Sequence, residues 1–138
     1  MAEFTSFFNP MSRALIAHWA LAEAKADFDV IEVSWEDKPQ ALLDANPMGK
    51  LPTIIHHRPE GDAVVSEAAA ICHYLADACA PDLLPRDSEK ADYFRMMFFA
   101  AGPLEAAVTS KTMGWEPKDA REEGTVGFGS FARATNML

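Results

Sequence analysis

The feature that most constrains the fold is the stretch 46–75, whose sequence is NPMGKLPTIIHHRPEGDAVVSEAAAICHYL. It has Leu51-Pro52 before a short β-branched run, then a turn rich in Pro and Gly, and finally Ser66-Glu67 before a helical pattern. A proline is tolerated at the first position of a strand, where its missing N–H costs no ladder hydrogen bond. An X-Pro bond can be cis, which turns the preceding backbone outward, where it can pair with a small extended ligand. The stretch therefore predicts a strand, a hairpin and a helix, with an open backbone segment at Leu51.

The second half of this stretch predicts a place for an anionic group. Ser66 is predicted as the N-cap of the helix, because serine is favoured at that position. The first amide N–H groups of a helix have no partner within it and can hold an anion. Each half alone is typical of an ordinary turn or helix cap. Their order and spacing together favour a site for a small peptide-like ligand.

Composition limits the classes of partner. The chain has 138 residues, of which 49% are hydrophobic, so we expect a globular protein with one domain, or one small domain and a further piece. The net charge of −9 disfavours nucleic acid and anionic membrane surfaces as partners. No apolar run is long enough for a membrane span, and the N-terminus lacks the basic region of a signal peptide. We therefore expect a cytoplasmic protein.

Neither the cysteines nor the histidines predict a metal or redox site. Cys72 and Cys79 fall seven residues apart in one helical pattern, which separates them by about 10 Å, too far for a disulfide. There is no C-x-x-C pair. The four histidines lack metal-ligand spacing with the cysteines. We expect two reduced thiols that are buried as small apolar residues, and no metal.

The first eighty residues predict alternating strands and helices. The expected strands are 4–8, 27–35, 52–57 and 63–65, and the expected helices are 13–25, 38–45 and 66–79. A helix between two strands of this length indicates a βαβ unit with a parallel strand pair. The element order is βαβαββα, which predicts a mixed four-stranded sheet.

The remaining residues predict helices. Residues 81–86 are a linker, and 87–111 are helical throughout, with a kink at Gly102-Pro103. A loop follows at 114–119. In 120–138, three glycines argue against a stable helix. The predicted domains are 1–80, an α/β domain, and 87–138, a partial all-α domain.

Four segments in this order resemble the glutathione S-transferase family. They are NPMSRALIAHWALAE (9–23), NPMGKLPTI (46–54), SEAAAICHYL (66–75) and DLLP (82–85). The resemblance covers about residues 3–111. It implies an α/β thioredoxin-like N-terminal domain, βαβαββα, that binds glutathione, followed by helices.

The resemblance also implies roles for residues in the glutathione site. Leu51, before a cis Pro52, is similar to the residue whose backbone pairs with the cysteinyl part of glutathione. Ser66 and Glu67 resemble the pair that holds the γ-glutamyl end, where the Glu67 carboxylate suits the ligand's ammonium group. Lys50 is placed to reach the glycyl carboxylate, although a solvated loop lysine is an equally good interpretation.

A weaker candidate for the glycyl carboxylate is Lys38. Activation of the glutathione thiol needs a donor near the end of the first strand, because only a few per cent of such a thiol is ionised at neutral pH. Where related proteins carry tyrosine, this chain has Phe7 or Phe8. Ser12 and Asn9 are the candidate catalytic residues, and Ser12 is equally well explained as a helix cap.

The implied activity is that of a glutathione S-transferase. Glutathione would be the co-substrate, without a metal, and its thiolate would attack a small electrophile or a peroxide, as in detoxification. Family members usually form homodimers and continue through further helices that build the electrophile pocket. The alternative is a non-catalytic binding or interaction module with the same fold. Disulfide exchange is disfavoured, because no cysteine lies near Pro10–Ser12.

Overall fold

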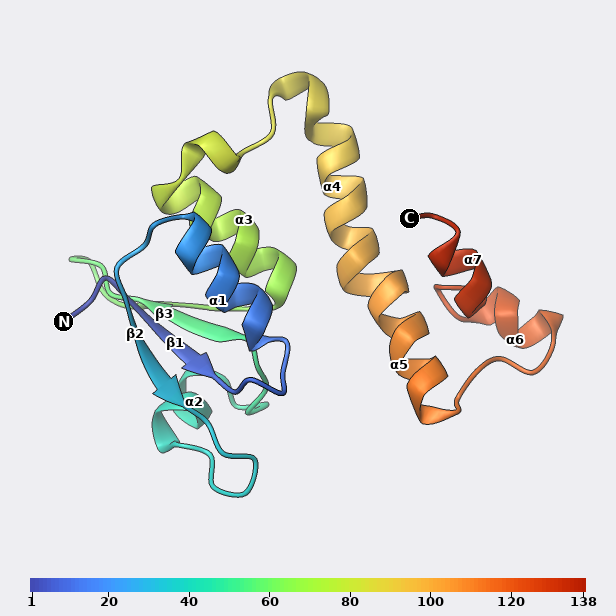
Figure 1. Cartoon of the computed structure of the whole chain (residues 1–138), viewed down its shortest axis with the longest axis horizontal. Coiled ribbons are helices and arrows are strands. Elements are labelled where there is room, and N and C mark those ends of the chain that lie inside the picture. Colours follow the sequence, from blue (N-terminus) through green and yellow to red (C-terminus); the bar gives the residue numbers. More distant parts are fainter. The chain divides into compact units, whose positions relative to one another are not determined.

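Four strands in the order β2-β1-β3-β4 form the sheet at the start of the chain. The computed structural model describes residues 1–138 and divides them into two units, Met1–Leu84 and Pro85–Leu138 (Figure 1). The strands are β1 (Phe4–Phe8), β2 (Phe28–Glu32), β3 (Thr53–His56) and β4 (Ala63–Ser66), and the helices of this unit are α1 (Ala14–Glu23), α2 (Gln40–Ala45) and α3 (Ala68–Cys79).

The topology is the predicted thioredoxin-like βαβαββα. β1 and β2 are parallel, as a βαβ unit requires, whereas β3 is antiparallel to both β1 and β4. The sheet is therefore mixed, and the predicted fold class is confirmed.

Alternation along the strands gives the sheet two buried faces. On one face, α1 and α3 lie side by side (Figure 1) and contribute Leu21, Ile71 and Leu75 to a core with Phe4 and Ile54. On the other face, the short α2 buries Leu42 against Phe7 and Val33. Because α2 has only six residues, this second core is small.

Helix α1 is shorter than the predicted 13–25, and its end has a clear cause. Lys25 takes a left-handed φ of 53°. The Lys25 N–H bonds the Ala22 carbonyl, and the Ala26 N–H bonds the Leu21 carbonyl. This pair of bonds is the Schellman motif, in which glycine is the usual residue at the left-handed position. Because lysine instead of glycine occupies this position, the sequence alone does not indicate where the helix ends.

The second unit contains four α-helices and one π-helical turn after a short turn. They are α4 (Lys90–Phe99), a π-helical turn at Ala100–Leu104 in place of the predicted kink, α5 (Glu105–Met113), α6 (Ala120–Thr125) and α7 (Phe131–Thr135). Pro103 lies inside the π turn, and Gly114 ends α5 with a φ of 69°. No helix of the chain is both long enough and apolar enough to cross a membrane.

The expectation of no stable helix in 120–138 is wrong. Asp119 begins α6 by accepting a hydrogen bond from the Glu122 N–H, and Ser130 begins α7 by accepting one from the Arg133 N–H. Side-chain caps of this kind satisfy amide groups that a short helix leaves open. Gly127 and Gly129 lie between the two helices, where they interrupt neither.

Candidate functional site

The strand register brings the three predicted site segments to one end of the sheet. Phe7 of β1 pairs with Thr53 of β3, and Thr53 pairs with Ser66 of β4. The residues that follow β1, precede β3 and end β4 or follow it therefore meet at the same end of the sheet. All seven predicted site residues belong to these segments.

The backbone at Leu51 is open, as predicted. The Leu51-Pro52 peptide bond is cis. Pro52 is buried and Leu51 is half-buried against the α2 side of the sheet. Neither the N–H nor the carbonyl of Leu51 takes part in a hydrogen bond within the chain. Both groups are thus available to an extended ligand.

The turn before Leu51 is held by two residues that the sequence analysis did not single out. The buried Thr53 hydroxyl donates to the Lys50 carbonyl at 2.9 Å and accepts from the Asn46 side chain at 3.0 Å. The Asn46 carboxamide oxygen accepts from the Met48 N–H at 3.1 Å. These bonds occupy the Lys50 carbonyl and leave Leu51 free. In the sequence, the indication of this role was that both polar residues flank the Gly-Lys turn.

At the end of β4, the helix cap is one residue later than predicted. Ser66 is still paired with Thr53 in the ladder, so it cannot also be the N-cap of α3. Glu67 takes that position, with φ 72° and ψ 123°, and its side chain does not cap the helix. The prediction of Ser66 as N-cap is wrong, because strand pairing extends through it.

The start of α3 offers free donors beside an exposed carboxylate. The first bond of the helix runs from the Ile71 N–H to the Glu67 carbonyl, so the N–H groups of Ala68–Ala70 lack partners within the helix. The Glu67 side chain is exposed. Neither Ser66 nor Glu67 forms a side-chain hydrogen bond or ion pair within the chain. This segment can take both an anionic and a cationic group.

The turn between β1 and α1 differs, because its polar groups are occupied. The Asn9 carboxamide donates to the Val33 carbonyl at 2.7 Å and accepts from the Met11 N–H at 2.8 Å. The Ser12 hydroxyl donates to the Asn9 carbonyl at 2.7 Å and accepts from the Ala14 N–H at 3.0 Å. Ser12 thus accepts the first N–H of α1, although Arg13 holds the N-cap position, and one N–H of Asn9 remains unused.

Of the two lysines, Lys38 has the more defined position. Its ammonium lies 3.2 Å from where a Cβ on Gly49 would be, directly beside the turn that leads to Leu51. Gly49 itself is buried and has a φ of +58°. Lys38 is half-buried, whereas Lys50 is exposed, and neither forms an ion pair within the chain. Lys38 is therefore the less exposed of the two cations near this turn.

The cysteines take no part in this site. Burial raises the pKa of the Cys72 thiol, and burial followed by the nearby Glu3 carboxylate raises that of Cys79. Both are free and half-buried in α3. No three His, Cys, Asp or Glu side chains are grouped so that they could hold a metal ion.

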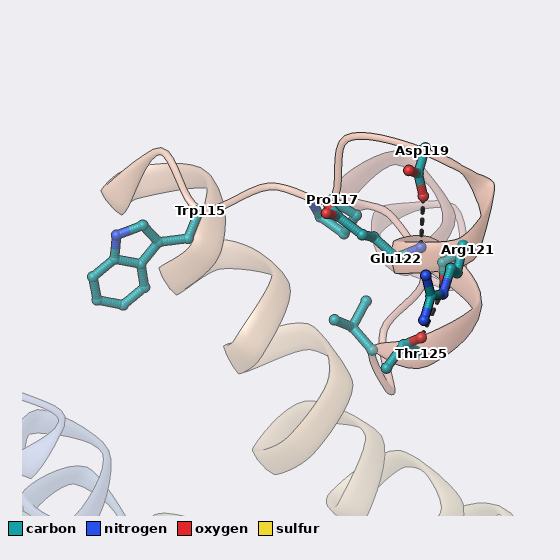
Figure 2. A pocket seen from close by; sticks show the side chains of 7 residues that line it. Trp115, Pro117, Asp119, Arg121, Glu122 and Thr125 are labelled. Carbon is teal, nitrogen blue, oxygen red and sulfur yellow. Dashed lines mark hydrogen bonds between the residues drawn. The ribbon is translucent and has the colours of Figure 1, made fainter.

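A pocket of about 380 Å³ lies in the second unit and includes none of the predicted site residues. Figure 2 shows the Trp115 ring pointing away from the other side chains of its lining. Asp119 accepts from the Glu122 N–H, Glu122 from the Lys118 N–H, and the Thr125 hydroxyl donates to the Arg121 carbonyl. The polar groups that line the pocket therefore mainly stabilise α6, and no ligand is assigned to the pocket.

Comparison with known proteins bears on the family and the fold of this chain. The model of the glutathione S-transferase N-terminal domain matches residues 2–77. Pyrimidodiazepine synthase of Drosophila melanogaster is 37% identical over 75 residues, which cover 53% of this chain and 30% of that protein.

Two solved structures extend the comparison to the whole chain. Glutathione transferase Omega 2C from Trametes versicolor has a TM-score of 0.74 at 18% identity, covering 99% of this chain and 62% of that one. The theta class enzyme of Xanthomonas axonopodis pv. citri, solved with glutathione bound, has a TM-score of 0.67 at 26% identity, covering 99% and 65%. The chain thus spans less than two thirds of each of these relatives. The model of the N-terminal domain matches more than half of this chain, and the chain therefore belongs to the glutathione S-transferase family.

Proposed function

We propose that the first unit binds glutathione along the edge formed by Leu51, Glu67 and the start of α3. The observation that carries this proposal is the open backbone of Leu51 beside the unpaired N–H groups of Ala68–Ala70. An extended tripeptide can pair with the Leu51 N–H and carbonyl as a further strand would. The solved theta class relative contains bound glutathione, which supports this ligand.

Charge at the two ends of the site fits the two ends of glutathione. The γ-glutamyl carboxylate would lie at the α3 N-terminus with Ser66, where amide donors and the helix dipole favour an anion. The γ-glutamyl ammonium would meet the Glu67 carboxylate in a charge-assisted bond. The glycyl carboxylate would meet Lys38, with Lys50 as the exposed alternative. These local cations matter because the chain carries a net charge of −9.

For the reaction, we propose transfer of the glutathione thiolate to a small electrophile. Ser12 would have to turn its hydroxyl proton from the Asn9 carbonyl towards the thiolate, a rotation about one bond. Asn9 can contribute its remaining N–H. Each donor lowers the energy of the thiolate and so raises the fraction that is nucleophilic.

The second candidate is a non-catalytic binding or interaction module of the same fold. It is favoured by the β1–α1 turn, where Ser12 and Asn9 already have partners in the chain. A homodimer, a cytoplasmic location and a role in detoxification accompany the transferase proposal. Solution mass measurement tests the first of these, and a clean monomer would contradict it.

Calorimetry with reduced glutathione tests binding, and an aryl halide such as 1-chloro-2,4-dinitrobenzene tests catalysis. We expect saturable binding below millimolar glutathione and formation of the thioether. Absence of binding at millimolar ligand would overturn the transferase and leave an interaction module. Binding without any rate above the uncatalysed reaction would leave the binding module.

A further inference from the structure

A hydroxyl, an imidazole and a carboxylate are joined in series at the opposite end of β1 from the glutathione site. The Thr5 Oγ1 lies 2.8 Å from the His57 Nε2, and the His57 Nδ1 lies 3.0 Å from an Asp62 carboxylate oxygen. They come from β1, from the residue after β3 and from the β3–β4 hairpin. Figure 1 shows that hairpin close to the N-terminal end of β1. The family resemblance assigns no role to these three residues.

The direction of each hydrogen bond follows from the chemistry of the groups. An ionised carboxylate only accepts, so in the neutral imidazole the proton sits on Nδ1 and is donated to Asp62. The Nε2 is then an acceptor, and the Thr5 hydroxyl must be the donor. The hydroxyl therefore donates to an imidazole, and a third group orients that imidazole. This is the arrangement of an activated nucleophile.

Thr5 is half-buried on the face of the sheet that α2 packs against. Thr5 and Phe7 share a face, where the α2 core buries Phe7 and also contacts Ile55, the residue opposite Thr5. Thr5 pairs with Ile55, which pairs with Val64, so these three side chains form a row across the strands. Ile55 is half-buried and Val64 is 47% exposed. The row gives a small apolar surface beside the hydroxyl, on which an acyl or aryl group can lie.

We propose that Thr5 accepts an acyl group from small, neutral, activated esters, without glutathione. The Thr5 oxygen attacks the ester carbonyl carbon as its proton passes to the His57 Nε2. The tetrahedral adduct then collapses, the bond to the leaving oxygen breaks, and that oxygen takes the proton from His57. Water, deprotonated by His57, releases the acid and returns the proton to Thr5. Asp62 is a positioning residue that fixes the imidazole tautomer.

Two features define the substrate class. Asp62 and the cross-strand neighbour Asp29 place negative charge beside Thr5, which disfavours anionic esters. The three groups supply a nucleophile and a base but no pair of donors for an oxyanion. The leaving group must therefore be a weak base, as in an aryl ester.

p-Nitrophenyl acetate in glutathione-free buffer tests the proposal. We expect nitrophenol release with acetylation of the peptide that contains Thr5, found by mass spectrometry. Thr5→Ser should keep this acetylation, and Thr5→Val, which has nearly the same volume, should lose it. Asp62→Asn should slow it by about 10²-fold, within the usual range for general base catalysis, and should alter its pH profile. Glu60→Gln is the matched control, because Glu60 pairs with Arg58 in the same hairpin, and it should leave the rate unchanged.

Either of two results would overturn the proposal. One is nitrophenol release by Thr5→Val at the wild-type rate, with circular dichroism showing a folded protein. The other is an unchanged rate of Thr5 acetylation in Asp62→Asn, which removes only an exposed carboxylate and so should fold even if Thr5→Val does not. A failure of glutathione binding would affect neither result, because the reaction uses no glutathione.

Discussion

Thr53 of β3 lies opposite Ser66 of β4, so Pro52 and Glu67 leave the ladder as neighbours. This one pairing places the open Leu51 backbone beside the start of α3, although fourteen residues lie between Leu51 and Ser66 in the sequence. A slip by one residue would turn every β4 side chain to the other face. The site therefore depends on the register of a short hairpin.

Glu67 should show opposite effects on stability and binding. Its φ of 72° with ψ of 123° is a strained backbone conformation for any residue but glycine, costing about 1–3 kcal/mol. Glu67→Gly should raise the free energy of unfolding in urea by about 1 kcal/mol. The same change should weaken glutathione binding by about 1.5–3 kcal/mol, because a bond to a charged group is lost.

Lys25→Gly is the control for that experiment. Lys25 has a φ of 53° at the end of α1, remote from the charged ligand groups. This substitution should also stabilise, by about 1 kcal/mol, and should leave glutathione affinity unchanged. Equal loss of affinity in both variants would show that the loss at Glu67 is not specific to its carboxylate.

Lys38 and Lys50 can be separated with a modified ligand. Lys38→Met should weaken binding of glutathione about tenfold, whereas Lys50→Met should have a smaller effect because that side chain is exposed. Glutathione amidated at the glycyl carboxylate should bind wild type and Lys38→Met with similar affinity. Lys38→Met could instead prefer unmodified over amidated glutathione as strongly as the wild type does. That result would show that a group other than Lys38 binds the glycyl carboxylate.

Removing the Ser12 hydroxyl should affect both stability and rate. Ser12→Ala loses the acceptor of the Ala14 N–H and should lower the free energy of unfolding by about 1 kcal/mol. If the hydroxyl stabilises the thiolate, the turnover with an aryl halide should fall about 10²-fold while glutathione affinity holds. The pH profile of the rate should then move to higher pH.

Ser6→Ala is the matched control for Ser12. The Ser6 hydroxyl is buried and makes no hydrogen bond within the chain. Its loss should therefore not destabilise the fold, since no protein partner is left unpaired. An unchanged rate in Ser12→Ala would confine Ser12 to its role as a helix cap.

The two cysteines should react slowly with iodoacetamide. Their raised pKa values mean that folding favours the neutral thiol, and the thiolate is the reactive form. The stability that this contributes is complete at neutral pH and is lost as pH rises through the raised pKa. Alkylation rates measured by mass spectrometry at about pH 8 should be lower in the folded than in the urea-unfolded protein. Equal rates would contradict the assignment.

The first unit should fold without the second. Residues 1–84 contain the whole sheet, both of its cores and every candidate glutathione contact. We expect this fragment to unfold cooperatively in urea and to bind glutathione as the full chain does. A non-cooperative transition would show that the proposed domains depend on each other.

The sequence predicted the fold better than the details of the site. Hydrophobic alternation and the Pro52 position sufficed for the strands, because burial dominates their placement. The strand pairing of Ser66 was missed, because a serine before a helix is typical of a cap and only the partner strand decides otherwise. The bond of the Asn9 side chain to Val33 joins the ends of neighbouring strands, so no local pattern contains it. The position of Lys38 beside Gly49 is likewise a contact that the sequence does not indicate.

The π-helical turn at Ala100–Leu104 changes how side chains are distributed along the helix that contains it. A π-helical turn contains about one residue more than an α-helical turn for the same rotation about the helix axis. Each residue of an α-helix accounts for about 100° of that rotation. The side chains of α5 are therefore rotated about the helix axis by about a quarter turn, compared with an α-helix that continued from α4 without interruption. An apolar row that begins at Phe94 and Phe98 does not extend straight into α5 but passes round the axis. A periodicity counted through this region without that offset would assign the wrong residues of α5 to the row.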